Sequence, residues 1–548
     1  MSPPIHSPFG PGQGDPLSPR FGGRLNHIGT PGGVGFGVGI CPLNHAAHGI
    51  FELPGTRILG HDNYGNYITA SGAVCIWRPM GWYRIGHVDN PTYATYGVNS
   101  IDIKPEWFFS SDAAANAAGY ARHRAFIDGG HNVRGFTRDK YPNSKQAWGA
   151  GYIASSVKNG LPISCHADHN PIADLTACSV NQYYEVINAA KARDGVDGAA
   201  NASSIWHQSS VFQRSWVALL ALAHAQAATS TANCAWYDAT GIANFAKGCN
   251  NNALSDVNDT SVKWESDGYS NCGKAGSAGY GGGAGNVFAK STCNGQNCGE
   301  ADVNGLMWEP VIGMTCVATS PAIEGITSAA TPVFTVTGHG LSAGSVIQIN
   351  GITQANWTNF KDKLWTVAAT PDANTFTLET APDTTAYAAY DAGADPGTIT
   401  KGTFYVAKQT TAMKDFTSGT ASATDHWGTT GVAAMMDAVT PAFRTDYPNN
   451  GFSQRFGNGA GQVLSGEPSG AAWLLDCAGF PLVTGLSAVG SSQFGADSIY
   501  QYIRDQCFRL AGGYWGSSTY AGAWAAPLNN FRTNSSHDVG VRLACYIG

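Results

Sequence analysis

The stretch that decides the fold is the last one, Gly512 to Cys545, which reads GGYWGSSTYAGAWAAPLNNFRTNSSHDVGVRLAC. Tyr and Trp side chains stand among its Ser, Thr, Asn and Gly residues: Tyr514, Trp515, Tyr520 and Trp524. Its formal charges are Arg532, Asp538 and Arg542. A disordered tail would be poor in aromatic residues, so we expect this end to be folded. Antibody-type binding surfaces share this composition, so the stretch is either a binding face or the Gly-rich end of a globular domain.

The composition of the whole chain favours irregular backbone around aromatic anchors. The chain has 548 residues, enough for roughly two to four domains with a sizeable core. Charged residues make up 13%, about half the usual share, and the 69 Gly residues are nearly twice the usual fraction of about 7%. The net charge of −7, the pI near 6.1 and the lack of a Lys/Arg run argue against a nucleic-acid partner.

Targeting signals and cysteines bear on where the protein is made. The N-terminal residues, MSPPIHSPFGPGQGDPLSPRFGG, lack the basic and apolar regions of a secretory signal peptide. The longest apolar run, WVALLALAHAQAA from Trp216, is interrupted by His224 and is too short to span a bilayer. The 13 Cys residues are scattered and odd in number, which favours buried thiols over a disulfide framework. We therefore expect synthesis in the cytoplasm and no membrane insertion.

Composition divides the chain into four segments. Residues 1–70 are rich in Pro and Gly and predict an extended segment that attaches the protein to a partner. Residues 71–318 and 403–548 share globular, Cys-containing sequence and are predicted to be two parts of one domain. Residues 319–402 lack Cys, are rich in Thr and Val, and alternate as short strands separated by turns. The sequence thus predicts a small all-β domain inserted into a larger one.

Strands and irregular loops are expected at three places in the larger domain. AVCIW (73–77) and WYRIG (82–86) have the composition of strands. No period holds between Asp238 and Cys298, so we expect coil tied by turns and side-chain hydrogen bonds there.

Four helices are also expected. Ser110, Ser111 and Asp112 are placed to cap a helix that continues through AAANAAGYARH. A second helix is predicted after Ser179, because Tyr183, Val186, Ile187 and Ala190 fall on one face at helical spacing. A third, over 210–228, is apolar nearly all round and therefore predicted to be buried. A fourth is expected over 497–507.

Two stretches carry a resemblance to a known family. ADVNGLMWEP (301–310) resembles the Asp-x-x-Gly-x-x-Trp-Glu signature of the formylglycine-generating-enzyme-like branch of the C-type lectin fold. The closing stretch resembles the Gly-Gly-x-Trp … Gly-x-Arg segment of that branch. Over roughly residues 70–548 the chain is similar to phage tail receptor-binding proteins with this fold, including those diversified by diversity-generating retroelements. The stretches that match are HRAFIDGGHNVRGFTRDKY, SSVKNGLPIS, KGCNNNAL, SDGYSNCGK and GAAWLLDCAGFP.

The resemblance implies an irregular, loop-rich α+β domain of the C-type-lectin type that binds a receptor, protein or glycan, on the host cell surface. It implies a homotrimer in the virion, at the tail tip or fibre, joined to other tail proteins through residues 1–70. Matched by position, the receptor-binding residues would be Tyr514, Ser517, Ser518, Tyr520, Asn529, Asn530, Thr533, Asn534, Ser535, Ser536 and His537. The fixed scaffold would comprise Trp308, Glu309, Trp515, Gly522, Gly540 and Arg542. The alternative is a structural tail or baseplate component without receptor specificity.

Catalysis is a further alternative, because the best-known members of this fold are oxidases. A formylglycine-generating oxidase holds copper with two cysteines, and the positions that match them are Asp538 and Leu543. Cys545 lies two residues further on, and a single thiol does not make a copper pair. The His-x-x-x-His-x-Glu motif of the related iron enzymes does not occur. We therefore expect no enzyme activity, with a metal-dependent oxidase as the remaining enzymatic hypothesis.

Three groups of residues resemble metal ligands. His166 and His169 lie beside Cys165 and Asp168, but a zinc site needs about four ligands and no second cluster is evident. The same holds for His45 and His48, so a structural loop is favoured in both places.

The third group offers oxygen donors. Asp256, Asn258 and Asp259 are hard oxygen donors in a loop, which suits either a structural calcium ion or Asx turns. No other cofactor is expected.

Overall fold

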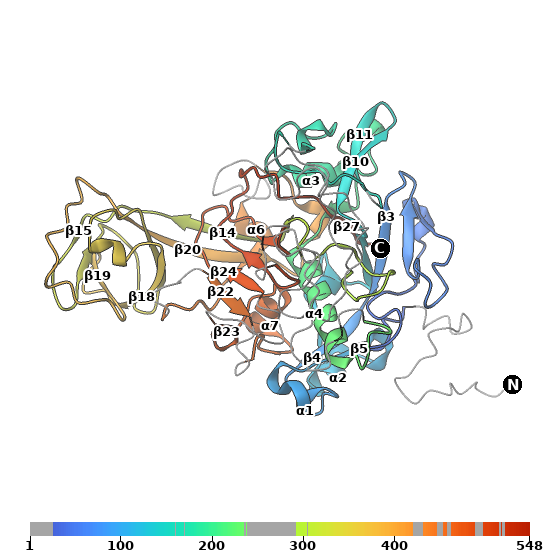
Figure 1. Cartoon of the computed structure of the whole chain (residues 1–548), viewed down its shortest axis with the longest axis horizontal. Helices are drawn as coiled ribbons and strands as arrows, with labels where there is room; N and C mark the ends of the chain where they lie inside the picture. The colour runs from blue at the N-terminus through green and yellow to red at the C-terminus, as the bar shows by residue number, and fades with distance from the viewer. Residues whose placement is uncertain are drawn as a thin grey trace.

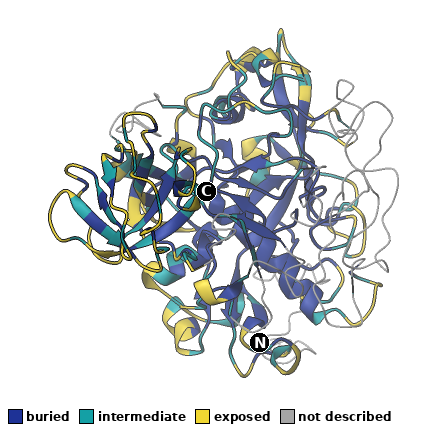
Figure 2. Cartoon of the chain, turned by 60° about the vertical axis from the view of Figure 1, so that its left-hand side comes forward, coloured by how far each residue is buried: buried dark blue, intermediate teal, exposed yellow. Residues whose placement is uncertain are grey.

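The computed structural model describes residues 26–158, 160–168, 170–234, 237, 292–303, 305–419, 431–446, 453–456, 462–487, 497–514, 517 and 521–547. Over these residues the protein is mixed α and β, with several small sheets and few helices. Figure 1 shows a main body and a narrower part that projects from it. Figure 2 shows that the strands of the main body are largely buried, while exposed residues gather in loops and at the outer end of the projecting part.

A six-stranded antiparallel sheet brings together both ends of the described chain. Its order is β1 (Ile50–Glu52), β2 (Asn66–Thr69), β3 (Val74–Pro79), β9 (Gly135–Asp139), β27 (Leu543–Cys545) and β12 (Trp206–Gln208). β27, the last strand, lies between β9 and β12, with Ala544 opposite both Arg138 and His207. The final residues of the chain are therefore in the core of the main body.

Smaller sheets surround this one. A three-stranded sheet has the order β5 (Ile101–Pro105), β4 (Gly81–Ile85), β6 (Ala121–Arg122), and a four-stranded sheet has the order β23 (Leu486–Ser487), β22 (Ser453–Phe456), β24 (Ser498–Tyr500), β26 (Ala526–Pro527). Three strand pairs complete the main body: β7 (Ile127–Asp128) with β8 (His131–Asn132), β10 (Asn143–Trp148) with β11 (Gly151–Ser156), and β13 (Glu309–Pro310) with β25 (Leu510–Ala511).

The helices are short apart from α4 (Val211–Ala227). Ser210 and Gln213 form a capping box at its start, and every residue from Val211 to Gln226 is buried, as its apolar composition predicts. The others are α1 (Tyr93–Tyr96), α2 (Asp112–Ala117), α3 (Glu185–Lys191), α6 (Val432–Met435) and α7 (Gly470–Cys477). The expected helices after Ser111 and Ser179 correspond to α2 and α3, and the Ser111 hydroxyl caps α2 by accepting from the Ala114 amide at 3.2 Å. The first helix is expected to continue through His123, but α2 ends at Ala117, and Ala121–Arg122 form β6 instead, which pairs with β4.

The projecting part, residues 320–399, has its own hydrophobic core and is called the β module below. Its strands are β15 (Gly325–Ile326), β16 (Val333–Thr335), β17 (Val346–Asn350), β18 (Lys363–Ala369) and β19 (Thr375–Leu378). Its core includes Phe334, Ile349, Trp357 and Phe376, which form a cluster separate from the large core of the main body. β14 (Met314–Thr319) and β20 (Thr398–Ala407) pair with each other and join the two parts, and β21 (Met436–Val439) pairs with β20 (Figure 1).

The expectation for the N-terminal segment is wrong over residues 26–70. Ile28, Phe36, Val38 and Ile50 are buried, and β1 and β2 belong to the six-stranded sheet. The segment contains many Pro and Gly residues because its tight turns need them, not because it stands apart from the fold. Residues 1–25 lie outside the described residues.

The helix expected over 497–507 is also absent. Residues Ser498–Tyr500 form β24, which pairs antiparallel with β22 and parallel with β26, and the residues that follow continue without helix. Gln501 and Ile503 are buried while Tyr502 and Arg504 are half-buried, so the burial pattern alternates with the period of a strand. Pairing with neighbouring strands overrode the local helical preference.

Candidate binding site

A buried ion-pair network holds the two stretches that carry the family resemblance against each other. Arg542 Nε donates to Glu309 Oε1 at 2.5 Å, and its other nitrogens donate to the carbonyl oxygens of Asp139, Lys140 and Ala301 at 2.8–3.1 Å. Arg138 donates to both Glu309 and Glu300. Two predicted scaffold residues, Glu309 and Arg542, are therefore paired.

Charge neutralisation inside this network is mutual. Burial alone would raise the pKa of Glu309, but the charges of Arg138, Arg542 and Arg214 lower it overall. Burial also raises the pKa of Glu300, and the neighbouring arginines again lower it below its ordinary value. Both carboxyl groups are therefore ionised at neutral pH, as a buried cluster with an excess of arginine requires.

Backbone hydrogen bonds place Trp308 beside the closing stretch. The Trp308 amide donates to the Asp538 carbonyl oxygen, and the Gly540 amide donates to the Trp308 carbonyl oxygen, both at 2.9 Å. A Cβ at Gly540 would lie 3.4 Å or more from its nearest neighbours, which is ordinary contact, so sterics do not demand glycine there. A second scaffold pair, Trp308 and Gly540, is thus joined through the backbone.

Gly522 is required by a close approach. Its φ is +153°, and a Cβ there would lie 1.8 Å from Oδ1 of Asp497. The same Asp497 carboxylate accepts from the Trp524 amide at 2.9 Å. Gly522 therefore lets the loop close onto a buried carboxylate. Trp515, the remaining scaffold prediction, lies outside the described residues.

An open hollow of about 480 Å³ lies where α3's flanking loop, β24, β26 and the closing stretch meet. The described residues that line it are Tyr183, Trp308, Ser453, Ser498, Tyr500, Leu510, Pro527, Asn529, Asn530, Ser536 and Asp538. Aromatic and apolar surface alternates with neutral hydrogen-bonding groups in this lining. This volume and this mixture are usual for ligand sites. It is called the C-terminal hollow below.

The structure brings together part of the predicted receptor-binding set. Asn529, Asn530 and Ser536 line the C-terminal hollow. Tyr514 packs next to it, with its ring centroid 6.4 Å from that of Trp308.

The other predicted residues have different surroundings. Ser517 is buried, and its hydroxyl accepts from the Tyr514 amide at 3.1 Å, so it shapes the loop and is not an exposed contact. Thr533, Asn534, Ser535 and His537 do not line the hollow. Ser535 donates to the Cys165 carbonyl oxygen at 2.7 Å. Ser518 and Tyr520 lie outside the described residues.

Several lining residues were missed by sequence reasoning. Tyr183 and Tyr500 come from segments predicted as helices, and Ser453 and Ser498 carry no motif. Asp538 is the exception, because the sequence shows it as the single acidic residue of the closing stretch. The hollow joins residues 183, 308, 453–500 and 510–538, and the sequence does not show that these segments meet.

A hydrogen-bonded chain of amides forms one side of the hollow. Asn534 Nδ2 donates to Asn530 Oδ1 at 3.3 Å, and Asn530 Nδ2 donates to Asn529 Oδ1 at 3.1 Å. The side-chain amide nitrogen of Asn529 is the last group in this series of hydrogen bonds, so it has N–H groups to offer a ligand. This chain fixes the orientation of both lining amides.

Asp538 is the one charged side chain among the described lining residues. Burial raises the pKa of its carboxyl above the ordinary value, although the Ser536 hydroxyl, which donates to Oδ1, and His537 oppose this shift. Burial lowers the pKa of His537, as does the nearby His166, whose ring centroid is 6.0 Å away, while Asp538 raises it. A partly uncompensated carboxylate therefore borders the hollow.

No metal site was found among the residues that the structure describes: no group of three or more His, Cys, Asp and Glu side chains there is placed to hold a metal ion. His166 Nδ1 lies 3.9 Å from Asp168 Oδ2, and His169 is outside the described residues. His45 Nδ1 is 2.7 Å from the Ile50 carbonyl oxygen. The calcium prediction for Asp256, Asn258 and Asp259 falls outside the described residues.

The positions compared with copper ligands are dispersed. Leu543 and Cys545 are buried in β27, and the Cys545 sulfur lies 2.8 Å from the Thr137 hydroxyl. Burial raises the pKa of the Cys545 thiol, with Asp139 adding to the shift and Thr137 opposing it. A thiol in this setting is a poor nucleophile and a poor metal ligand.

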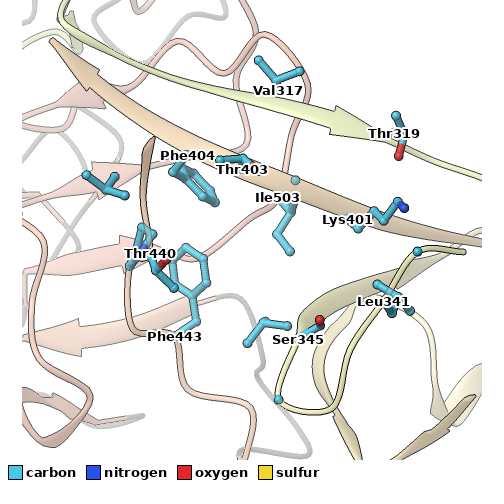
Figure 3. Close-up of a pocket in the computed structure, with 16 residues that line it drawn as sticks. Val317, Thr319, Leu341, Ser345, Lys401, Thr403, Phe404, Thr440, Phe443 and Ile503 are labelled. Atoms are coloured by element: carbon cyan, nitrogen blue, oxygen red, sulfur yellow. The ribbon is translucent and has the colours of Figure 1, made fainter. Parts of the chain in front are cut away.

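A second hollow, also of about 480 Å³, lies at the root of the β module. On the edge of β20 next to it, Thr398–Thr400 pair with β17 and Phe404–Ala407 pair with β21, so residues 401–403 have no strand partner on that edge. Figure 3 shows Phe443 and Ile503 turned toward the space between β20 and the loop that carries Leu341 and Ser345. Among its described lining residues, Lys401 is the one titratable group, and its ammonium donates to the His339 carbonyl oxygen, so the hollow offers no reactive chemistry.

Comparison with protein-family models gives no match to this chain, and comparison with curated protein sequences gives none either. Among the described helices, none has the length and apolar character needed to cross a membrane.

Proposed function

We propose that this chain is a phage tail receptor-binding protein that recognises a host surface receptor through the C-terminal hollow. The observation that carries the proposal is the hollow itself, because Asn529, Asn530 and Ser536, three residues assigned to the binding face by resemblance, line it together with Trp308. Tyr, Trp, Asn and Ser are the side chains that adaptable binding surfaces favour. The hollow therefore has the chemistry of a recognition site.

The proposal includes the finer fold assignment, a C-type-lectin-like domain of the formylglycine-generating-enzyme type. The support is the contact between the two signature stretches: Glu309 pairs with Arg542, and Trp308 hydrogen-bonds to Asp538 and Gly540. In such a domain these contacts hold the loops that form the binding face. We further propose a homotrimer at the tail tip or fibre of the virion, where several copies would raise avidity.

The test is adsorption of virions that carry Asn530→Trp. The indole would fill the C-terminal hollow, so we expect the adsorption rate to the host to fall at least tenfold while tails still assemble. The control is Asn132→Trp, the same change on the exposed hairpin β7–β8, away from the hollow. Normal adsorption of the Asn530→Trp virions would contradict the proposal.

The competing hypothesis, a structural tail or baseplate component, predicts another outcome. Adsorption would survive Asn530→Trp, and deletion of residues 1–25 would block tail assembly. A deletion of residues 1–70 would not serve as this test, because Ile28, Phe36 and Ile50 belong to the core and their removal would unfold the main body. The oxidase hypothesis predicts stoichiometric copper or iron in the purified protein, measured by elemental analysis.

A further inference from the structure

The C-terminal hollow combines one half-buried carboxylate with aromatic rings and has no described basic side chain in its lining. Asp538 borders it beside Tyr183, and the Asp538 charge is among the causes that raise the pKa of the Tyr183 hydroxyl, after burial. Trp308 and Tyr500 supply two further rings. A cation placed there would meet a carboxylate and aromatic faces together, the two groups that attract cations in proteins.

The carboxylate of Asp538 is under-compensated by the protein's own groups. The Ser536 hydroxyl donates to it, His537 lies beside it, and no described lysine or arginine forms an ion pair with it. Burying a carboxylate without a counter-charge is costly, and a ligand that brings one recovers that cost.

Nearby arginines are occupied elsewhere. The Arg504 guanidinium lies 4.4 Å from the centroid of the Phe531 ring, and that of Arg532 lies 5.2 Å from the centroid of the Tyr184 ring. Neither lines the hollow. Within the part of the chain that the structure describes, the cation position of the hollow is therefore left to a ligand.

We propose that the C-terminal hollow takes a basic side chain, lysine or arginine, of a protein receptor, with its cationic group between Asp538 and the rings of Trp308 and Tyr183. Leu510 and Pro527 supply apolar lining for the methylene stem of such a side chain. Asn529 and Asn530 offer N–H groups to the receptor's backbone carbonyls. This proposal rests on the proposed function, and it names the chemical class of the receptor contact.

The test measures binding of Nα-acetyl-lysine methylamide to the full-length protein by saturation-transfer NMR and calorimetry. We expect this probe to bind and its Nε-acetylated form, which lacks the positive charge, to bind at least tenfold more weakly. Asp538→Asn should remove that difference, because the amide keeps the shape of the carboxylate and loses its charge. The matched control is Asp89→Asn, which replaces an exposed carboxylate that does not line the hollow. It should leave the difference between the two probes unchanged.

A pH series on the unmodified protein gives a second readout that does not depend on a variant folding. Protons compete with the cation for the carboxylate, so affinity should fall as the pH falls through the pKa of Asp538, which lies above 3.8. The titratable groups around this carboxyl are His537, His166, Tyr183 and Cys165. Protonation of the two histidines would add positive charge and weaken binding in the same direction, so the Asp538→Asn series separates the contributions.

Three results would overturn the inference: equal binding of the two lysine probes, no binding of either, or binding of glucosamine without binding of the lysine probe, which would point to an amino sugar. The adsorption test reports independently. If Asn530→Trp abolishes adsorption but the lysine probe does not bind, the receptor function stands and the basic-side-chain inference fails. If the probe binds and adsorption of the Asn530→Trp virions is normal, the hollow takes a basic side chain but is not the receptor-binding site.

Discussion

Glu309 and Arg542 show how single residues support this fold. The network around them buries four arginines and two glutamates: Arg78, Arg138, Arg214, Arg542, Glu300 and Glu309. Desolvation of so many charges is costly, and it is tolerated because each carboxylate contacts at least two guanidinium groups. The network lies between β13, β9 and the residues just before β27, so it ties the end of the chain to its middle.

Replacing one carboxylate of this network should therefore lower the stability of the folded protein substantially. Glu309→Gln leaves Arg542 without its carboxylate partner and Arg138 with Glu300 alone. We expect a loss of about 3–5 kcal/mol in the free energy of unfolding, measured by urea denaturation. Glu106→Gln is the matched control, because its pair with Arg134 is partly exposed and should contribute less than about 1 kcal/mol. Similar losses for the two variants would contradict the role of the network.

The network also predicts acid sensitivity. The pKa values of Glu300 and Glu309 are depressed in the folded state, so the unfolded chain takes up protons first as the pH falls. Their contribution to stability is complete above the unfolded value of about 4.5 and is lost as the pH falls through the lower, folded values. Urea unfolding between pH 7 and pH 3 should show this loss, and Glu309→Gln should reduce its slope.

At the scale of elements, α4 depends on a defined start. It is buried on all sides, so packing supplies most of its stability, but its first amides still need partners. Ser210 accepts from the Gln213 amide at 3.2 Å, and Gln213 Oε1 accepts from the Ser210 amide at 2.9 Å. Both partners are buried, and water does not readily replace them.

Ser210→Ala should lower the free energy of unfolding by about 1–2 kcal/mol, at the upper end for helix caps, because the orphaned amides are buried. Thermal unfolding followed by circular dichroism is the measurement. Ser111→Ala, which removes the cap of the exposed helix α2, is the comparison and should cost less, since water can reach its first turn. A larger loss in unfolding free energy for Ser111→Ala would show that burial of the cap does not determine its contribution to stability.

At the scale of the whole molecule, the β module behaves as an added unit. Most of its core is separate, although Leu364 of β18 packs in the core of the main body. Its side-chain contacts with the main body also include the Thr366–Thr445 hydroxyl pair at 2.8 Å and Gln348 Oε1, which accepts from the Ile503 amide at 3.0 Å. β14 and β20 pair up to Thr319 and Lys401, after which the chain enters the module.

The module should be removable. Replacing residues 320–400 by Asn-Gly would close β14 and β20 into a hairpin, since a two-residue turn of this type joins directly paired residues. We expect the shortened chain to fold with the near-ultraviolet circular dichroism of the main body, to keep the response to Glu309→Gln, and to bind the lysine probe. An unfolded product would show that the module is part of the main body's core.

Local sequence information was sufficient where a signal lies within one segment. The capping serines, the apolar run of α4 and the turn-separated strands of 319–402 predict elements that the structure contains. Such signals depend on neighbours a few residues apart, which propensity and periodicity describe. The failures are segments fixed by contacts with residues far away in the sequence. Residues 26–70 are held by hydrogen bonds to His224, Asn294 and Cys298, and residues 498–500 pair with β22 and β26.

The sequence by itself determined the aromatic and amide composition of the closing stretch, the insertion of a Thr- and Val-rich β segment, and the presence of α2, α3 and α4. Only the tertiary structure decided that β27 lies inside a six-stranded sheet, that Glu309 and Arg542 neutralise each other, and that Tyr183, Trp308 and Asp538 border one hollow with Asn529 and Asn530. The physical reason is the range of the interactions: capping and periodicity act over a few residues, whereas burial of charge and the closure of a hollow join groups hundreds of residues apart.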